Sequence, residues 1–258
     1  MIKILILSLL YIFSFGNNIV KICDDSAGWA PYAYQKNGKP EGFSVALSHE
    51  IFKRLNQKVS FEMIPWKRCL YLVEHFNIVH KYEIVADGSY SEKRAKKYYQ
   101  SLPIYYTHQV LFYSDKKFTK SEILNIIKSD VNRLKMCDVN GYQTEHYKKV
   151  LGYTKKIDKS AKNFAVVLKK ISIGRCDALI APKEIVYAEQ VIYKNIIPKD
   201  IKNVKLNQYK PLAFYFWIAK TSLRGKKLVN SINKEIKIIK NEGIYQKLYN
   251  KYVLGMTK

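Results

Sequence analysis

Residues 87–94 read DGSYSEKR, and residues 101–106 read SLPIYY. The first stretch places two hydroxyls, Ser89 and Ser91, and the guanidinium of Arg94 on one short turn ahead of a strand-like run. Arginine presents a rigid fork of donors that holds a carboxylate through two hydrogen bonds, and hydroxyls satisfy its remaining lone pairs. Taken alone, the stretch better fits the polar start of a solvated helix. Its position in the rest of the chain favours a site for a small carboxylate.

The N-terminal segment has the features of an export signal. Lys3 supplies a positive charge, and residues 4–15 form an apolar run that is too short to cross the ~30 Å hydrocarbon core as a helix. Small residues at Ser14 and Gly16 predict cleavage after Gly16, so we expect residues 1–16 to be removed and the protein to reach the periplasm. The alternative is a buried N-terminal strand. No later segment is long and apolar enough to predict a membrane span.

The formal net charge of +24 comes mostly from lysine. A charge of this size is compatible with binding to nucleic acid or to an anionic membrane surface. The lysines, however, are spread along the whole chain and fall mainly on the polar faces of helical patterns, as at Lys234, Lys237 and Lys240. No zinc-finger, helix-turn-helix or aromatic RNA-binding motif occurs. We therefore expect no nucleic-acid partner, and attribute the charge to a biased genome composition.

Apolar patterning predicts alternating strands and helices in the first part of the chain. Residues 43–55 carry apolar side chains at helical spacing, including Val45, Leu47 and Ile51, and residues 59–63 alternate as a strand does. In order, the expected elements are strand 19–23, helix 43–55, strand 59–63, helix 69–76 and strand 83–86. Strands separated by helices indicate a parallel sheet covered on both faces, which is an α/β fold.

A similar unit follows and indicates a second lobe. Its expected elements are strand 133–139, helices 145–151 and 164–171, and a short strand over 178–181. Two more apolar runs, 105–113 and 212–219, are expected to connect the lobes as a two-strand hinge, and the tail 228–252 to pack back on lobe 1. Such lobes enclose a cleft that favours ligands. The predicted domains are 1–16 (signal), 17–106 (lobe 1, first part), 107–213 (lobe 2) and 214–258 (lobe 1, C-terminal part).

Four cysteines in an exported chain suggest disulfides rather than metal binding or catalysis. None belongs to a CxxC pair, so a zinc site is not expected. Four cysteines allow three pairings, and sequence alone does not choose among them. If each bridge stays within one lobe, the pairs are Cys23–Cys69 and Cys137–Cys176. The alternative is that at least one pair is free and buried as small apolar side chains.

Four groups of motifs, in this order, resemble those of the bacterial extracellular solute-binding proteins of family 3, the polar amino-acid type that serves ABC importers. They are WAPY with GKPEGF at 29–32 and 38–43, SYSEKR with SLPIY at 89–94 and 101–105, GRCDA at 174–178, and GIYQKL at 243–248. PWKRCL at 65–70 resembles a divergent branch with poorly defined ligands. The resemblance covers nearly all of the expected mature chain. It implies a two-lobe periplasmic-binding-protein fold of type II, the Venus flytrap.

The resemblance also implies a ligand site on lobe 1. Arg94 would clamp the carboxylate of the ligand, with Ser89 and Ser91 as further donors. Ser91 stands where the family usually has threonine, which keeps the hydroxyl. Asp87 and Gly88 precede them on the same turn and would offer a side-chain or backbone acceptor to an amine.

Further contacts are implied on both lobes. Trp29 and Trp66 occupy positions that wall the ligand side chain in the family, and ordinary packing is the alternative for both. From lobe 2, Tyr142, Gln143 and Thr144 fall where a helix start supplies donors to the carboxylate, which suits an anion. A plain helix cap is the alternative.

The chain departs from the family pattern at the expected ammonium partner. Pro182 stands where many amino-acid binders have an aspartate, and Glu184 is close enough to substitute if the loop bends differently. His80 and Glu83 stand where glycine and aspartate usually precede the binding turn. An α-amino acid therefore fits the pattern, and so does a carboxylate without an amine.

These observations favour a periplasmic solute-binding protein. It would capture a small carboxylate-bearing solute, an amino acid or a relative, for the membrane permease of an ABC importer. The two tryptophans favour an aromatic, planar or cationic side group. No GxSxG, HExxH or Walker motif occurs, so we expect no enzymatic activity and no cofactor or metal site. We also expect the protein to be a monomer. The alternatives are a ligand-sensing partner of a membrane receptor and a periplasmic enzyme on the same fold.

Overall fold

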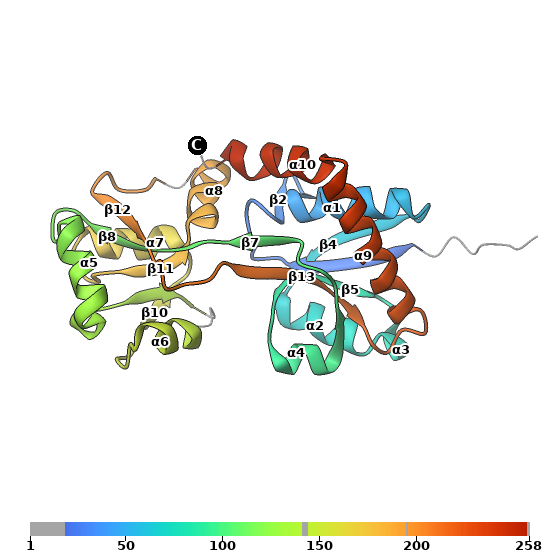
Figure 1. The fold of residues 1–258 in the computed structure, drawn as a ribbon, viewed down its shortest axis with the longest axis horizontal. Coiled ribbons are helices and arrows are strands. Elements are labelled where there is room, and N and C mark those ends of the chain that lie inside the picture. The colour runs from blue at the N-terminus through green and yellow to red at the C-terminus, as the bar shows by residue number, and fades with distance from the viewer. Residues whose placement is uncertain (1–18, 141–143, 195, 257–258) are drawn as a thin grey trace, which may run out of the picture.

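The computed structural model describes residues 19–140, 144–194 and 196–256. It contains two α/β lobes joined by two extended segments (Figure 1), the architecture that the sequence predicts. The sheet of lobe 1 has the strand order β4-β1-β5-β13-β6, with β7 also paired to β13. Its strands are β1 (Val20–Asp25), β4 (Val59–Ile64), β5 (Ile84–Ser89), β6 (Tyr98–Gln100), β7 (Tyr105–Thr107) and β13 (Leu212–Ala219). A short hairpin of β2 (Tyr34–Lys36) and β3 (Lys39–Glu41) lies outside it.

The centre of this sheet is parallel, and one strand from late in the chain makes it mixed. β1 runs parallel to both β4 and β5, as the alternation of strands and helices predicts. β13 runs antiparallel to β5, β6 and β7. The sequence predicted β13 only as a hinge strand. It also joins this sheet, and it is antiparallel because the chain returns from lobe 2 straight into the strand without a crossover helix.

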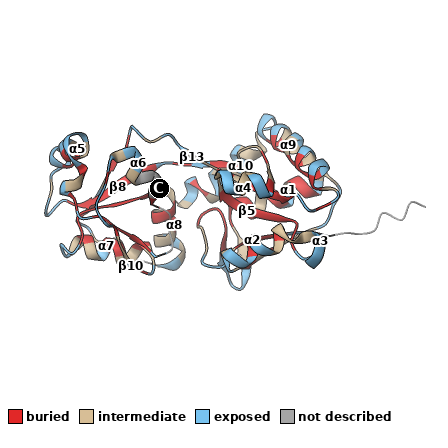
Figure 2. Ribbon diagram, turned by 90° about the horizontal axis from the view of Figure 1, so that it is seen from below, coloured by how far each residue is buried: buried red, intermediate tan, exposed pale blue. Residues whose placement is uncertain are grey.

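Helices cover both faces of the lobe 1 sheet (Figure 1). α1 (Phe43–Arg54), α9 (Gly225–Asn241) and α10 (Ile244–Tyr252) pack together on one face. α2 (Trp66–Glu74), α3 (Phe76–Val79) and α4 (Glu92–Lys97) lie on the other face. The single helix predicted over 69–76 begins earlier and breaks at His75. Figure 2 shows the buried strands beneath helices whose outer faces are exposed.

Glycine is required at the start of α1. Gly42 has a φ of 125°, and an added Cβ would lie 2.2 Å from the carbonyl oxygen of Tyr32. The loop that contains Tyr32 is therefore held against the first turn of α1, where Phe43 N–H donates to Pro31 O at 3.1 Å and Ser44 N–H donates to Tyr32 O at 2.9 Å. This loop consequently approaches the carboxyl ends of the parallel strands.

Lobe 2 is built around β8 (Gln109–Ser114), which runs antiparallel to β11 (Leu179–Pro182) and β12 (Ile201–Lys205). β9 (Cys137–Val139) pairs in parallel with β10 (Asp158–Ala161). The strand predicted over 133–139 is shorter, because Val131–Arg133 forms a 3-10 turn. The helices are α5 (Lys120–Ser129), α6 (Glu145–Leu151), α7 (Phe164–Ser172) and α8 (Lys183–Tyr193), and a 3-10 turn, η2 (Leu254–Met256), follows α10 at the end of the chain.

The lobes are connected at the hinge and also touch beside it. The run predicted as one hinge strand over 105–113 divides at His108 into β7, which pairs in lobe 1, and β8, which pairs in lobe 2. Helix α8 of lobe 2 reaches lobe 1, where Ala188 packs against Ala30 and Tyr34. The predicted tail helices pack on α1, as expected.

Two disulfides staple the structure, one in each lobe. Cys23 of β1 is bonded to Cys69 of α2, and Cys137 of β9 is bonded to Cys176. This is the pairing expected if each bridge stays within one lobe. Asp158 lies beside the second bridge, but the bonded sulfurs offer no thiolate to a metal. Within the described residues, no helix has the length and apolar character needed to cross a membrane.

Glu83 anchors the start of β5 to the start of α9 within lobe 1. Its side chain is buried and accepts hydrogen bonds from Arg224 Nη2 and from the Ser222 hydroxyl, both at 2.6 Å. The ion pair joins the start of β5 to the start of α9. Glu83 therefore makes a structural contact within lobe 1.

We expect the Cys137→Ser/Cys176→Ser double variant to be less stable than the wild type. Opening a bridge between residues 39 positions apart restores entropy to the unfolded chain and lowers the free energy of unfolding by ~2–4 kcal/mol. Urea unfolding under non-reducing conditions measures the loss. Reduced wild-type protein, which lacks both bridges, should be less stable than the variant. Equal stability of the variant and the oxidised wild type would contradict the expectation.

Candidate functional site

Arg94 is a half-buried cation on helix α4, at the edge of the lobe 1 sheet. Its guanidinium carbon lies 5.6 Å from the ring centroids of both Trp66 and Trp217, so it sits between two indoles. Its Nη1 donates to the backbone carbonyl oxygen of Ser89. Burial lowers the pKa of Arg94, and no carboxylate in the described part of the chain forms an ion pair with it. A desolvated cation in this state favours an external anion.

The two serines of the predicted turn have different roles. Ser91 caps α4, because its hydroxyl oxygen accepts the N–H of Arg94 at 3.2 Å. This is the polar helix start that the stretch alone predicts. The cap fixes the first turn of α4, which carries Arg94, and the hydroxyl hydrogen of Ser91 still has an acceptor to find. Ser89 is half-buried at the end of β5, opposite Phe214.

Asp87 occupies an irregular position in β5. Val85 lies opposite Trp217 and Gly88 lies opposite Tyr215, so three steps along β5 match two along β13. The extra residue forms a bulge, a feature that re-aims side chains beside functional sites. Asp87 has a left-handed φ of 53°, a conformation that aspartate tolerates better than most residues. Gly88 must be glycine, because an added Cβ would lie 2.5 Å from the Trp217 ring.

Asp87 meets a second buried acid, Asp24, which our sequence analysis did not single out. The two carboxyl groups lie within hydrogen-bonding reach, and the residues are only 2% and 7% exposed (Asp24 and Asp87). The Ser44 hydroxyl donates to Asp87 Oδ1 at 2.5 Å. Burial raises the pKa of Asp87 to about 6. Burial and the neighbouring Asp87 raise the pKa of Asp24 well above its usual range.

The sequence did contain a signal for Asp24. It lies near the end of β1 as Asp87 lies near the end of β5, and these strands are parallel neighbours. Ligand sites in α/β sheets gather at the carboxyl ends of parallel strands. Acidic residues that follow two predicted strands of one parallel sheet therefore indicate a shared position.

Aromatic rings stand beside the two acids. Tyr32 and Tyr105 stack with centroids 3.5 Å apart, and Tyr105 lies 4.9 Å from Phe214. Trp29 is half-buried and completes the row, 5.8 Å from Phe214. The two predicted tryptophans therefore lie in different places, because Trp66 stacks on Arg94.

Of the contacts predicted from lobe 2, the structure describes Thr144 and Glu184. Thr144 is buried at the start of α6 and its side chain makes no cap hydrogen bond. Tyr142 and Gln143 lie outside the described residues. Glu184 accepts the backbone N–H of His108 at 3.4 Å, and its Oε1 lies 2.9 Å from Nδ1 of that histidine. The Glu184 carboxylate is therefore already engaged at the junction of β7 and β8.

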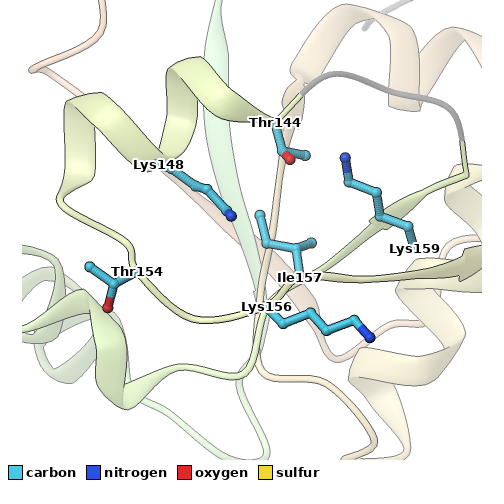
Figure 3. Close-up of a pocket in the computed structure, with 6 residues that line it drawn as sticks. All are labelled: Thr144, Lys148, Thr154, Lys156, Ile157 and Lys159. Atoms are coloured by element: carbon cyan, nitrogen blue, oxygen red, sulfur yellow. The ribbon is translucent and has the colours of Figure 1, made fainter.

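Lobe 2 also has a partly open hollow of about 360 Å³ (Figure 3). Its lining residues are Thr144, Lys148, Thr154, Lys156, Ile157 and Lys159. Three of these six are lysines, so the hollow is electropositive. None of the predicted lobe 1 site residues lines it, and the Arg94 turn is a separate place.

The chain matches the sequence model of a protein family over residues 21–255. That family is described as bacterial extracellular solute-binding proteins, family 3. The match covers almost the whole described chain and includes both lobes. No protein of curated function matches the chain in sequence.

Several solved structures share the fold. The arginine-, lysine-, histidine-binding protein ArtJ from Geobacillus stearothermophilus is 19% identical, with a TM-score of 0.67 over 91% of this chain and 95% of its own. A histidine kinase sensor domain similar to periplasmic binding proteins is 17% identical, with a TM-score of 0.70 over 92% and 96%. The ancestral amino-acid-binding protein AncCDT-1, a precursor of cyclohexadienyl dehydratase, is 23% identical, with a TM-score of 0.66 over 91% and 95%. Identities this low establish the fold alone.

We expect Ser91→Ala to destabilise the protein through loss of the α4 cap. The free energy of unfolding should fall by ~1 kcal/mol, the usual effect of removing a serine cap. Ser89→Ala is the matched control, because its hydroxyl caps no helix, and its effect should stay within ~0.5 kcal/mol. Urea unfolding of both variants without ligand measures the difference. Equal stability of the two variants would mean that Ser91 does not cap α4.

Proposed function

The chain belongs to the bacterial extracellular solute-binding proteins of family 3, and on that premise we propose that it captures a small carboxylate-bearing solute, an amino acid or a relative, between its lobes. One observation carries the proposal. Arg94 is held half-buried between Trp66 and Trp217, and no described carboxylate pairs with it. A charge fixed in this way before ligand arrives is suited to binding an anion.

The carboxylate would bind along the free edge of the Arg94 guanidinium. One N–H group is already used on Ser89 O, and the planar fork retains further donors for a carboxylate. Further hydrogen bonds to the carboxylate would come from the same turn, from the hydroxyls of Ser89 and Ser91 and the backbone at Gly88. The indoles on either side exclude water, which strengthens a charge-assisted hydrogen bond.

Trp29 and the neighbouring rings would contact the side group of the solute. The row from Trp29 through Phe214 to Tyr105 offers flat faces, which suit a planar, aromatic or cationic group. An amine of the solute would turn to Asp87. Glu184 is the weaker partner, because its carboxylate already contacts His108.

Lobe 2 would close over the bound solute, with Tyr142, Gln143 and Thr144 as its contribution. A ligand shifts the lobes toward the closed form only by its differential affinity for that form. We propose that the mature protein acts in the periplasm as a monomer, after removal of residues 1–16, and delivers its solute to the permease of an ABC importer. A sensing role remains the alternative, because a histidine kinase sensor domain shares the fold at a TM-score of 0.70.

A thermal-shift screen of the purified mature protein against amino acids, dicarboxylates and small peptides tests the proposal. A specific solute at 100 times its Kd stabilises the protein by ~2.7 kcal/mol through mass action and raises the melting temperature. Incubation with the solute followed by NMR of the mixture distinguishes binding from turnover. The absence of any stabilising solute would contradict the proposed function, and a consumed solute would replace it with an enzyme.

We expect Arg94→Ala to lose most of the affinity for the stabilising solute. Removing the guanidinium leaves a desolvated carboxylate without its partner, which costs ~2–5 kcal/mol of binding free energy. Arg94→Lys should recover only part of the loss, because lysine lacks the planar fork. Calorimetry measures both. Arg68→Ala is the control, because it removes an exposed arginine of the same lobe. An unchanged affinity in folded Arg94→Ala would remove Arg94 from the site.

A further inference from the structure

Two buried carboxyl groups face each other where β1 and β5 end. Asp24 Oδ1 accepts the N–H of Asp25 at 2.7 Å, and Asp87 Oδ1 accepts the hydroxyl of Ser44 at 2.5 Å. The second oxygen of each acid, Oδ2, is buried and has no hydrogen-bond partner of good geometry among the described residues. The two acids nevertheless lie within hydrogen-bonding reach of each other.

Contact between two carboxyl oxygens is favourable only if one carries a proton, because both are otherwise acceptors. The groups that surround the pair do not remove this requirement, since they are acidic or neutral. They are Asp25 on β1, Ser44 on α1, Tyr105 on β7 and Tyr32 in the loop before β2. Two acids in a dry site titrate together, and the first proton binds with a pKa above the ordinary carboxyl range.

Gly88 separates this pair, on the α1 face of the sheet, from Arg94, which lies on the other face against Trp66 and Trp217. Asp87 precedes Gly88 directly, and a Cβ on Gly88 would lie 3.4 Å from Nη1 of Arg94. A site for an anion and a site for a cation are therefore adjacent on one turn. Their charges complement those of a solute that carries a carboxylate and a positively charged nitrogen in the same molecule.

We propose that Asp24 and Asp87 share one proton in the ligand-free protein, and that a cationic nitrogen of the bound solute displaces this proton to solvent. Before binding, the pair holds one proton and one negative charge. After binding, it carries two negative charges against the cation, and the proton is in the water. This inference rests on the proposed function and adds that the solute is cationic at one end.

The proton and the cation compete, so the affinity should depend on pH in one direction. The shared proton binds with the higher of the two pKa values, which burial and the neighbouring Asp87 raise well above the usual range at Asp24. Affinity should therefore fall by up to about tenfold per pH unit below that value, and more steeply below about 6, where Asp87 also takes a proton. The same raised pKa values make the ligand-free fold more stable on acidification. That gain is fully present below the unfolded-state pKa of aspartate, about 3.9, and is lost as pH rises through the folded-state values.

Four solutes with the same six-carbon carboxylate chain separate the contributions of the α-amine and the terminal amine to binding. L-lysine carries both amines, L-norleucine only the α-amine, 6-aminohexanoate only the terminal amine, and hexanoate neither. Calorimetry of the purified protein with each solute, in phosphate and in Tris, counts the protons released, because these buffers differ in heat of ionisation. We expect an amine-bearing solute to bind at least about tenfold more tightly than hexanoate and to release close to one proton. Hexanoate should release none.

Asparagine variants test the pair without changing its shape. Asn keeps the carbonyl oxygen that accepts from Ser44 or Asp25, and it tolerates the left-handed backbone at position 87. Asp24→Asn and Asp87→Asn should each lose at least about tenfold in affinity for the amine-bearing solute, keep the affinity for hexanoate and release less proton. Asp138→Asn is the matched control, because Asp138 is also buried and burial raises its pKa to about 7.

Equal affinity and no proton release for all four solutes would overturn the inference while leaving the carboxylate contact of Arg94 intact. So would a thermal-shift screen in which only solutes without a cation stabilise the protein. If no solute stabilises it, the proposed function itself fails. Infrared spectra of the ligand-free protein test independently whether the acid pair carries a proton. A protonated-carboxyl band at neutral pH must weaken in Asp24→Asn/Asp87→Asn more than in Asp138→Asn, and an unchanged band would also overturn the inference.

Discussion

The site on lobe 1 depends on how β13 pairs with β5. The Trp217 indole N–H donates to the carbonyl oxygen of Gly88 at 2.8 Å, and one face of the same ring supports Arg94. The register shift between these strands places Asp87 in its bulge. One strand therefore fixes the cation and the acid together. Because Trp217 is 129 residues from Gly88, the site forms only after the chain has returned from lobe 2.

The site keeps charged groups out of water before any ligand is present. Burial lowers the pKa of Arg94 and raises the pKa values of Asp24 and Asp87, so in each case the charged form is disfavoured. A fold that retains such groups gives up stability, which proteins commonly do where they bind or react. The compensation is that the donors and acceptors are already oriented, so a solute with matching charges has little to reorganise.

Sequence patterns predicted the parts of this protein that follow from local periodicity. They are the parallel core and the polar turn that carries Arg94. The disulfide pairing was predicted only on the condition that each bridge stays within one lobe. What these patterns did not show depends on contacts between distant residues. Periodicity identified β13 as a strand but not its antiparallel direction, because direction follows from the path of the chain. The placement of Trp66 beside the ligand stays a prediction, and nothing local in the sequence shows that Trp66 stacks on Arg94. The ion pair of Glu83 could not be read from the sequence, because its partner Arg224 lies 141 residues away.

The hinge adds a constraint on how lobe 2 moves. Glu184 at the start of α8 contacts His108, where the apolar run divides into β7 and β8. Further along α8, the Tyr193 hydroxyl lies so close to Gly28 that an added Cβ there would be 2.7 Å away. Both contacts lie on α8, so this helix holds the two lobes together at one edge. In the proposed closure, a movement of lobe 2 that preserves both contacts would pivot about α8. A solute needs to supply only the difference in free energy between the open and closed forms to favour the closed form.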